Sequence, residues 1–115
     1  MEVPAQFHFT HRRMVEFCDT DLAGIVHFSN FFRYVESAEH AFFRSLGHSV
    51  HTTADGDHQG WPRIDVACKY HKPARFEQTL EIGLRLVELR NSSLRYEFWI
   101  LGAERALLAT GAFSI

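Results

Sequence analysis

The chain has 115 residues, of which 46% are hydrophobic and 14% aromatic, and its formal net charge is −2. This length suits one domain with a single core, spanning residues 1–115, and the apolar fraction excludes an intrinsically disordered chain. The Lys and Arg residues are scattered, so no basic stripe predicts nucleic-acid binding. No apolar run approaches the ~20 residues that cross a bilayer, so we expect no membrane insertion.

Cysteine usage and the N-terminal segment indicate the compartment. The two cysteines, Cys18 and Cys68, do not make a disulfide framework. No positively charged and then apolar N-terminal segment resembles a signal peptide. We therefore expect a cytoplasmic protein.

The first half of the chain predicts a strand, a loop and a helix. Residues 6–17 carry apolar side chains on one parity, interrupted by His11, which predicts a strand. Residues 19–26 follow as a loop held by Gly24. From Ser29 the apolar spacing becomes helical, and Ser29 or Asn30 would cap the helix start. Gly47 is placed to end the helix. The apolar stripe of this helix is Phe31, Val35, Ala38, Phe42 and Leu46.

The second half predicts a long loop and then four strands. Residues 48–62 are polar and aperiodic, which is typical of a loop. Alternating residues then predict strands over 64–70, 80–86 and 94–100, and residues 105–115 are a further strand of small residues. The links carry turn residues, and short links favour antiparallel pairing of consecutive strands. The order β-α-β-β-β-β predicts an α+β domain, with the long helix packed on one face of a five-stranded antiparallel sheet.

The carboxylates of Asp19 and Asp21 immediately before the helix allow three interpretations. They can shape the loop through Asx turns. They can imitate a calcium loop, although Ala23 occupies the third ligand position and Asn30 stands where the bidentate Glu belongs. Or they can be catalytic, because free N–H groups around residues 28–30 would stabilise an oxyanion beside a carboxylate base. The residues alone leave these alternatives open.

Two long segments resemble one enzyme family. V-E-F-C-D-T-D-L-A-G-I-V-H-F-S-N-F-F-R-Y-V-E-S-A, residues 15–38, is similar to the signature of the 4-hydroxybenzoyl-CoA thioesterase family of hot-dog fold proteins. R-I-D-V-A-C-K-Y-H-K-P-A-R-F-E-Q-T-L-E-I, residues 63–82, resembles the next strand, Pro-Ala loop and strand of that family. The resemblance covers nearly the whole chain in the right order.

This resemblance implies a fold, an assembly and a set of site residues. It implies a long helix wrapped by a curved sheet, in a homodimer that often forms a homotetramer. Asp21 matches the catalytic carboxylate of the family, and the backbone N–H of Phe28 matches the oxyanion donor. A catalytic role is not transferred to His27, although some relatives carry a His at the position of Phe28. The residues expected to contact the substrate or its coenzyme A part are Gly24, Arg90, Asn91, Ser92 and Ser93.

The expected activity is hydrolysis of an acyl-CoA thioester. Asp21 would attack the thioester carbon or deprotonate a water that does so, with no metal and no cofactor beyond the coenzyme A of the substrate. One alternative is a thioesterase acting on acyl carrier protein, recognised by a basic patch of His71, Lys72 and Arg75. Another is a non-catalytic acyl-CoA-binding module. A hot-dog dehydratase would need a His and an acid facing one pocket, and no such motif is present.

Other residues have weaker functional interpretations. Cys18 at a strand end is typically a small buried hydrophobe, and Glu36 is the reserve catalytic residue. Glu39 falls off the apolar stripe and is expected on a solvated or interface face. An acyl pocket would be lined by Trp61 and the Phe31/Phe32 pair. The aperiodic loop contains a possible metal cluster, whose spacing matches no standard zinc pattern: His48, His51, Asp55, Asp57 and His58.

Overall fold

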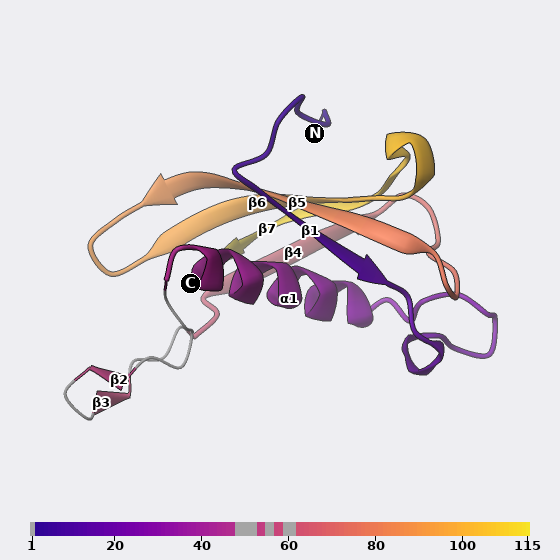
Figure 1. The fold of residues 1–115 in the computed structure, drawn as a ribbon, viewed down its shortest axis with the longest axis horizontal. Coiled ribbons are helices and arrows are strands. Elements are labelled where there is room, and N and C mark those ends of the chain that lie inside the picture. The colour runs from indigo at the N-terminus through magenta and orange to yellow at the C-terminus, as the bar shows by residue number, and fades with distance from the viewer. Residues whose placement is uncertain (1, 48–52, 55–56, 59–61) are drawn as a thin grey trace.

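The computed structural model describes residues 2–47, 53–54, 57–58 and 62–115. One long helix, α1 (Asn30–Ser45), lies along one face of an antiparallel sheet (Figure 1). The sheet has five strands in the spatial order β1 (Phe9–Met14), β5 (Thr79–Leu89), β6 (Leu94–Leu101), β7 (Leu107–Ser114) and β4 (Asp65–Tyr70). The predicted α+β class, with one long helix on a five-stranded antiparallel sheet, is confirmed. Within the described residues, no helix has both the length and the hydropathy that crossing a membrane requires.

Three short features add to this plan. The segment expected to be an aperiodic loop contains a pair of two-residue strands, β2 (Thr53–Ala54) and β3 (Asp57–His58). A single 3-10 turn, η1 (Phe17–Asp19), follows β1, and a second one, η2 (Ala103–Arg105), joins β6 to β7. Sequence periodicity cannot detect elements of two or three residues, because they are shorter than one repeat of either pattern.

The strand order differs from the expected pairing of consecutive strands. β4 pairs with β7, from Asp65 opposite Ser114 to Tyr70 opposite Ala109, and not with β5. Both neighbouring positions of β5 are occupied, by β1 on one side and β6 on the other. The link between β4 and β5, residues 71–78, therefore crosses the end of the sheet. The expected antiparallel pairing of consecutive strands is therefore wrong for β4 and β5.

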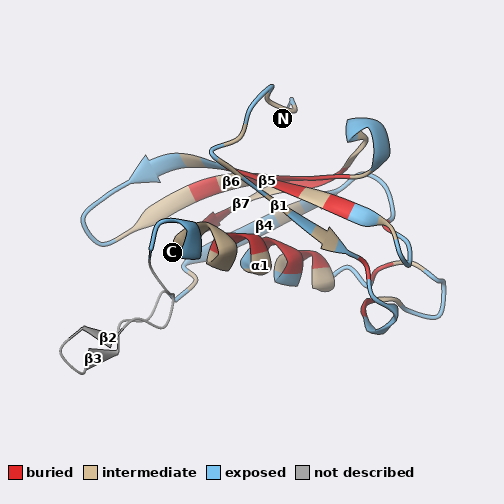
Figure 2. Ribbon diagram, viewed as in Figure 1, coloured by how far each residue is buried: buried red, intermediate tan, exposed pale blue. Residues whose placement is uncertain are grey.

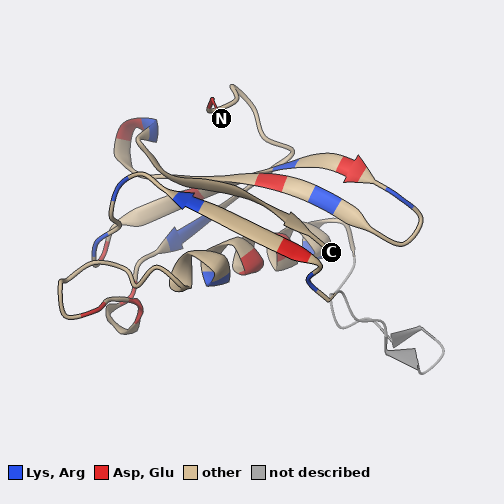
Figure 3. Cartoon of the chain, turned by 180° about the vertical axis from the view of Figure 1, so that it is seen from behind, with Lys and Arg blue, Asp and Glu red and all other residues tan. Residues whose placement is uncertain are grey.

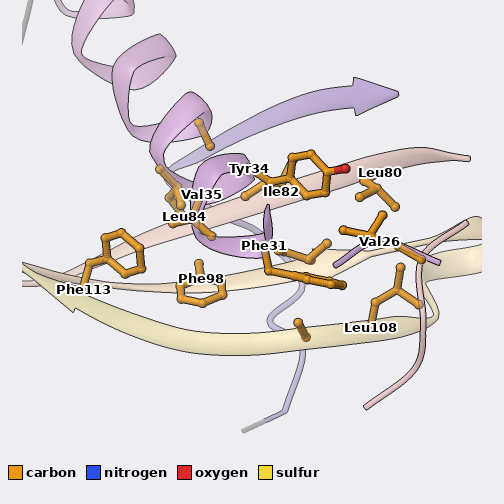
Figure 4. Close-up of a cluster of buried hydrophobic side chains, with 14 of the residues drawn as sticks. Val26, Phe31, Tyr34, Val35, Leu80, Ile82, Leu84, Phe98, Leu108 and Phe113 are labelled. Atoms are coloured by element: carbon orange, nitrogen blue, oxygen red, sulfur yellow. The ribbon is translucent and has the colours of Figure 1, made fainter. Parts of the chain in front are cut away.

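The core lies between α1 and the facing side of the sheet (Figures 2 and 4). The predicted alternation is confirmed in the middle of β5 and β6, where the inward positions are buried in the core, while Leu86 and Leu94 at the far ends are partly buried. The helix stripe differs at three positions: Tyr34 and Glu39 are buried, whereas Leu46 in the capping turn is 58% exposed. The larger core side chains are Phe31, Tyr34, Val35, Leu80, Ile82, Leu84, Tyr96, Phe98 and Phe113.

The two ends of α1 are held in different ways. Gly47 has φ +83° and follows the last turn, so the predicted glycine stop is confirmed. At the start, Ser29 occupies the N-cap position without making a side-chain cap. Its hydroxyl pairs instead with Nδ1 of His27 at 2.8 Å, and the side-chain amide of Asn30 donates to the carbonyl of Asp19 at 2.9 Å. The predicted Ser29 or Asn30 cap is therefore wrong, since both side chains serve the preceding loop.

The N-terminal segment covers part of the sheet face away from the helix. The ring of Phe7 lies over Gly83, and its centroid is 5.6 Å from that of Trp99. Arg105 donates to the carbonyl of Pro4 at 2.9 Å, which fixes the segment to the turn after β6. Both faces of the central strands are therefore covered by protein at this point.

Candidate active site

The loop that carries Asp21 is closed by main-chain hydrogen bonds. The N–H of Asp21 donates to the carbonyl of Ile25 at 2.9 Å, and the N–H of Gly24 donates to the carbonyl of Asp21 at 3.0 Å. Gly24 has φ +79°, a left-handed conformation that glycine adopts without strain. Oδ1 of Asp21 accepts the N–H of Ala23 at 2.9 Å. Oδ2 has no hydrogen-bond partner among the residues that the structure describes.

Asp19 has the opposite environment to Asp21. Asp19 is 6% exposed, and its Oδ2 accepts the N–H of Glu16 at 3.0 Å and the hydroxyl of Tyr34 at 2.8 Å. Its carbonyl accepts the N–H of His27 at 3.0 Å. Burial, together with the hydrogen bond and charge of Asp19, raises the pKa of Tyr34, which keeps the hydroxyl protonated as a donor. Asp19 thus fixes the loop to the helix, while Asp21 stays exposed to solvent.

A cavity of about 550 Å³ opens beside Asp21. Its walls are Asp21 with residues 25–28 of the loop, Phe31 of α1, and residues 70–73 at the end of β4. The ring of Tyr70 is nearly perpendicular to the ring of Phe31, with centroids 5.2 Å apart. This volume is in the range of small-molecule pockets, and the lining combines aromatic rings with a carboxylate.

The carbonyl of Phe28 is held by a residue of the cavity wall. The hydroxyl of Tyr70 donates to the carbonyl of Phe28 at 2.9 Å. Burial first, and then the charge and hydrogen bond of Cys68, raise the pKa of Tyr70 to about 12, so Tyr70 is a donor at neutral pH. Within the described chain, the N–H of Phe28 has no hydrogen-bond partner. The structure therefore brings together Asp21 and Phe28, the two residues that the sequence indicated for catalysis.

Comparison with known proteins assigns the family. The family model of the thioesterase superfamily matches residues 23–108. The chain belongs to the thioesterase superfamily. Its helix on a five-stranded antiparallel sheet is the hot-dog fold of that superfamily. The matched range begins at Ala23, two residues after Asp21, and contains all of α1, the strands β4, β5 and β6, and the first two residues of β7.

Three proteins of known sequence or structure are similar to most of this chain. A curated protein of Aquifex aeolicus (strain VF5), provisionally named an esterase, is 33% identical over 99 residues, which cover 86% of this chain and 77% of that protein. A hypothetical protein from Aquifex aeolicus has a solved structure with 30% identity and a TM-score of 0.76, covering 92% and 95% of the two chains. A gentisyl-coenzyme A thioesterase has 27% identity and a TM-score of 0.82, covering 91% and 84%.

The residues expected to contact coenzyme A do not line the cavity of Asp21 in the same chain. Gly24 shapes the loop of Asp21 but does not line the cavity. Arg90 lies in the turn between β5 and β6, at the opposite end of the molecule in Figure 1. It is 71% exposed, and its Nε donates to Glu88 at 2.8 Å. Asn91, Ser92 and Ser93 complete the same turn.

The sequence placed Glu39 incorrectly. Glu39 is 2% exposed, and it accepts the hydroxyl of Tyr96 at 2.6 Å and Nη1 of Arg63 at 2.7 Å. Burial raises the pKa of Tyr96, and the charge of Glu39 raises it further. Burial lowers the pKa of Arg63, but the hydrogen bonds and charge of Glu39, with smaller contributions from Tyr96 and Glu36, together outweigh it and leave the pKa raised. The reserve residue Glu36 pairs with the same Arg63 at 3.1 Å and does not line the cavity.

The remaining candidates are partly outside the described chain. Trp61 and three members of the polar loop, His48, His51 and Asp55, are not among the described residues. Among those that are described, no group of three or more His, Cys, Asp or Glu side chains could hold a metal ion. Phe31 lines the cavity, whereas Phe32 packs on Phe113 with centroids 5.7 Å apart. Tyr70 was missed as a site residue because its place in the alternating pattern indicated only a core position.

Proposed function

We propose that the protein hydrolyses acyl-CoA or aroyl-CoA thioesters with Asp21 and the N–H of Phe28. The observation that carries this proposal is the cavity lined by both residues, in which Oδ2 of Asp21 and the N–H of Phe28 have no partner within the described chain. A thioester carbonyl oxygen accepting the Phe28 N–H would gain stabilisation as it becomes an oxyanion. Asp21 would lie beside the carbon that is attacked.

Two reaction routes are consistent with this arrangement. In one, Oδ2 of Asp21 attacks the thioester carbon, the thiolate of coenzyme A leaves, and water hydrolyses the resulting anhydride. In the other, the Asp21 carboxylate takes a proton from a water that attacks the same carbon. Both routes give a carboxylic acid and free coenzyme A, and neither requires a metal or a further cofactor. The similarity to a gentisyl-coenzyme A thioesterase supports coenzyme A as the thiol.

We further propose that the working unit contains at least two copies of this chain. β4 is an edge of the sheet, and it exposes apolar side chains, among them Val66 and Tyr70, together with an unpaired row of main-chain groups. Ile64, just before β4, is exposed as well. A second copy covering this edge would bury these groups. It would also allow the Arg90 turn of one copy to approach the cavity of the other.

The decisive experiment measures free-thiol release from short, long and aromatic acyl-CoAs. Asp21→Asn keeps an oxygen for the Ala23 N–H and removes only the charge, so the loop should persist. We expect at least one substrate to be cleaved by wild type, with kcat lower by about 10²–10⁴-fold in Asp21→Asn. Glu97→Gln on β6 makes the same carboxylate-to-amide change outside the cavity and should leave kcat unchanged.

Other outcomes identify the alternatives. Full activity in Asp21→Asn would show that this carboxylate is not the reacting group. Cleavage of acyl carrier protein thioesters in preference to acyl-CoA would identify the other class of thiol carrier. Binding of acyl-CoA without thiol release by wild type would identify a non-catalytic module and would contradict the proposed activity.

A further inference from the structure

A second hollow adjoins the cavity of Asp21. It has a volume of about 590 Å³ and lies between the link of residues 71–78 and the turn around η2. Lys72, Arg75 and Phe76 line it on one side, and Ala103 and Ala106 line it on the other. Lys72 and Pro73 belong to the lining of both hollows. The two spaces are therefore separated by a single stretch of chain.

Hydrogen bonds fix the main chain of that separating stretch. The N–H groups of His71 and Lys72 both donate to the carbonyl of Leu108, at 2.8 and 3.2 Å. Two residues further on, the carbonyl of the fully buried Ala74 accepts the N–H of Val26 at 2.8 Å. The link is thus attached to β7 on one side and to the loop of Asp21 on the other. The side chains of Lys72 and Arg75 extend from a backbone that is already ordered.

The charges in the second hollow favour an anion. Within the described residues, neither Lys72 nor Arg75 forms an ion pair, whereas Arg63, Arg90 and Arg105 all do. The lining holds two cations, Lys72 and Arg75, against the carboxylate of Glu77. Figure 3 shows Lys and Arg segments at this end of the sheet, near the loop of Asp21. Unpaired cations beside a hollow suit a phosphate group, to which a guanidinium can donate two parallel hydrogen bonds.

We propose that the second hollow binds the phosphate of a phosphopantetheine thiol, with Lys72 and Arg75 as its ligands. The inference rests on the proposed thioesterase activity and names how its substrate is held. A thioester substrate has two parts, the acyl group and the thiol carrier, which extend in opposite directions from the reacting carbon. The acyl group occupies the cavity of Asp21, and the phosphopantetheine crosses the wall at Lys72 and Pro73. Arg90, which already pairs with Glu88, is not needed for this phosphate.

The test uses one acyl group on three thiols. Acyl-pantetheine lacks a phosphate, acyl-4′-phosphopantetheine adds one, and acyl-CoA adds the nucleotide part. We expect wild type to have a lower KM for both phosphorylated thioesters. In the double variant Lys72→Ser, Arg75→Ser that preference should fall by roughly tenfold or more, because both charged donors to the phosphate are lost. The kcat/KM for acyl-pantetheine should not change.

The control removes a cation elsewhere. Arg12→Ser on β1 changes an exposed Arg outside both hollows, so it reports the effect of net charge alone. It should leave all three KM values as in wild type. The phosphopantetheine can belong to coenzyme A or to acyl carrier protein, so the assay is repeated with acyl carrier protein that carries the same acyl group. If the double variant affects acyl-CoA and acyl-4′-phosphopantetheine but not the protein-bound thioester, the phosphate belongs to coenzyme A.

Several results would overturn the inference. The double variant could change all three substrates equally, or none of them. Only acyl-CoA could be affected, which would assign the contact to the nucleotide phosphates. Arg90→Ser alone could abolish the preference. If wild type cleaves no thioester, the proposed activity fails, and calorimetric titration of phosphopantetheine into wild type and the double variant then tests the phosphate site separately.

Discussion

At the scale of single residues, two pairs of similar groups have different tasks. Asp19 is buried and anchors the loop, whereas Asp21 is exposed beside the cavity. Two tyrosine hydroxyls divide in the same way. Tyr34 donates to the carboxylate of Asp19, and Tyr70 donates to the carbonyl of Phe28. Asp19 and Tyr34 therefore support the fold, whereas Asp21 and Tyr70 line the cavity.

The two tyrosines give a paired prediction. Tyr34→Phe removes the hydroxyl donor of the buried Asp19 carboxylate and leaves it with the N–H of Glu16 and the weak thiol donor of Cys18, so we expect a loss of about 1–3 kcal/mol in the free energy of unfolding. Tyr70→Phe removes the hydroxyl donor of the exposed Phe28 carbonyl, which keeps the N–H of Phe31, so it should cost less stability, but it should lower kcat because the Phe28 peptide is less ordered. Urea unfolding and thiol-release kinetics measure the two effects. A larger stability loss in Tyr70→Phe would contradict this assignment.

A second residue-scale prediction concerns Glu39 and Arg63. Arg63→Met leaves Glu39 as a buried carboxylate with only the Tyr96 hydroxyl as a donor. Removing one partner of a buried pair typically costs about 3–5 kcal/mol, and the partly exposed position of Arg63 places this variant at the lower end. Adding Glu39→Met to that variant should recover part of the loss in a urea titration. No recovery would mean that the pair is not the source of the cost.

The sequence alone could place a residue only where its partners lie close to it along the chain. The motif around Asp21 and Phe28 is local, so the sequence alone could assign both residues to one site. Glu39 could not be placed, because its burial depends on Arg63, 24 positions later, and on Tyr96 from another strand. The proximity of Tyr70 to Phe28 joins residues 42 positions apart. Periodicity assigns a residue to a face but does not identify its partner across the core.

At the scale of elements, the strands were predictable and their neighbours were not. Alternation located β5 and β6 to within a few residues, because each has one face in the core, and a run of small residues located β7. The pairing of β4 with β7 is a consequence of β1 occupying the free side of β5. β1 and β5 are separated by more than 60 residues, so no local pattern contains that information.

Two glycines give a prediction at this scale. A Cβ on Gly83 would meet the ring of Phe7, while a Cβ on Gly111 would meet the main-chain carbonyl of Ala67 on β4. The Phe7 ring can change its rotamer to make room for a Cβ, but the main chain of β4 is held by its hydrogen bonds to β7. We expect Gly83→Ala to cost about 1–3 kcal/mol and to become nearly neutral in a Phe7→Ala background. Gly111→Ala should lower the melting temperature more. Equal melting temperatures for the two variants would contradict this reasoning.

At the scale of the whole molecule, stability should depend on pH through His11. Burial, followed by the charges of Arg13 and Arg44, lowers the pKa of His11 below 6.5. Its Nε2 lies 3.3 Å from the hydroxyl of Ser37, which links β1 to α1. The unfolded chain therefore binds this proton at higher pH than the folded chain. The contribution of His11 is fully present above pH 6.5 and decreases as the pH falls through the folded pKa.

The measurement compares unfolding free energies at about pH 7.5 and about pH 5 for wild type and His11→Gln, since His titrates in this range. Gln keeps a polar group near Ser37 but does not titrate. We expect wild type to lose more stability than His11→Gln between the two pH values. Identical losses would show that the other histidines and carboxylates account for the whole dependence.

The strand order also determines when the protein can fold during synthesis. Both edge strands are made early and find their partners late: β1 waits for β5, and β4 waits for β7, which ends at Ser114. Until then, the apolar positions of β4 have no neighbouring strand. Contacts between such distant segments slow folding and lengthen exposure to aggregation. A nascent chain that stalls before β7 would therefore present the β4 edge on both sides, and chaperones that recognise extended apolar segments would bind it there.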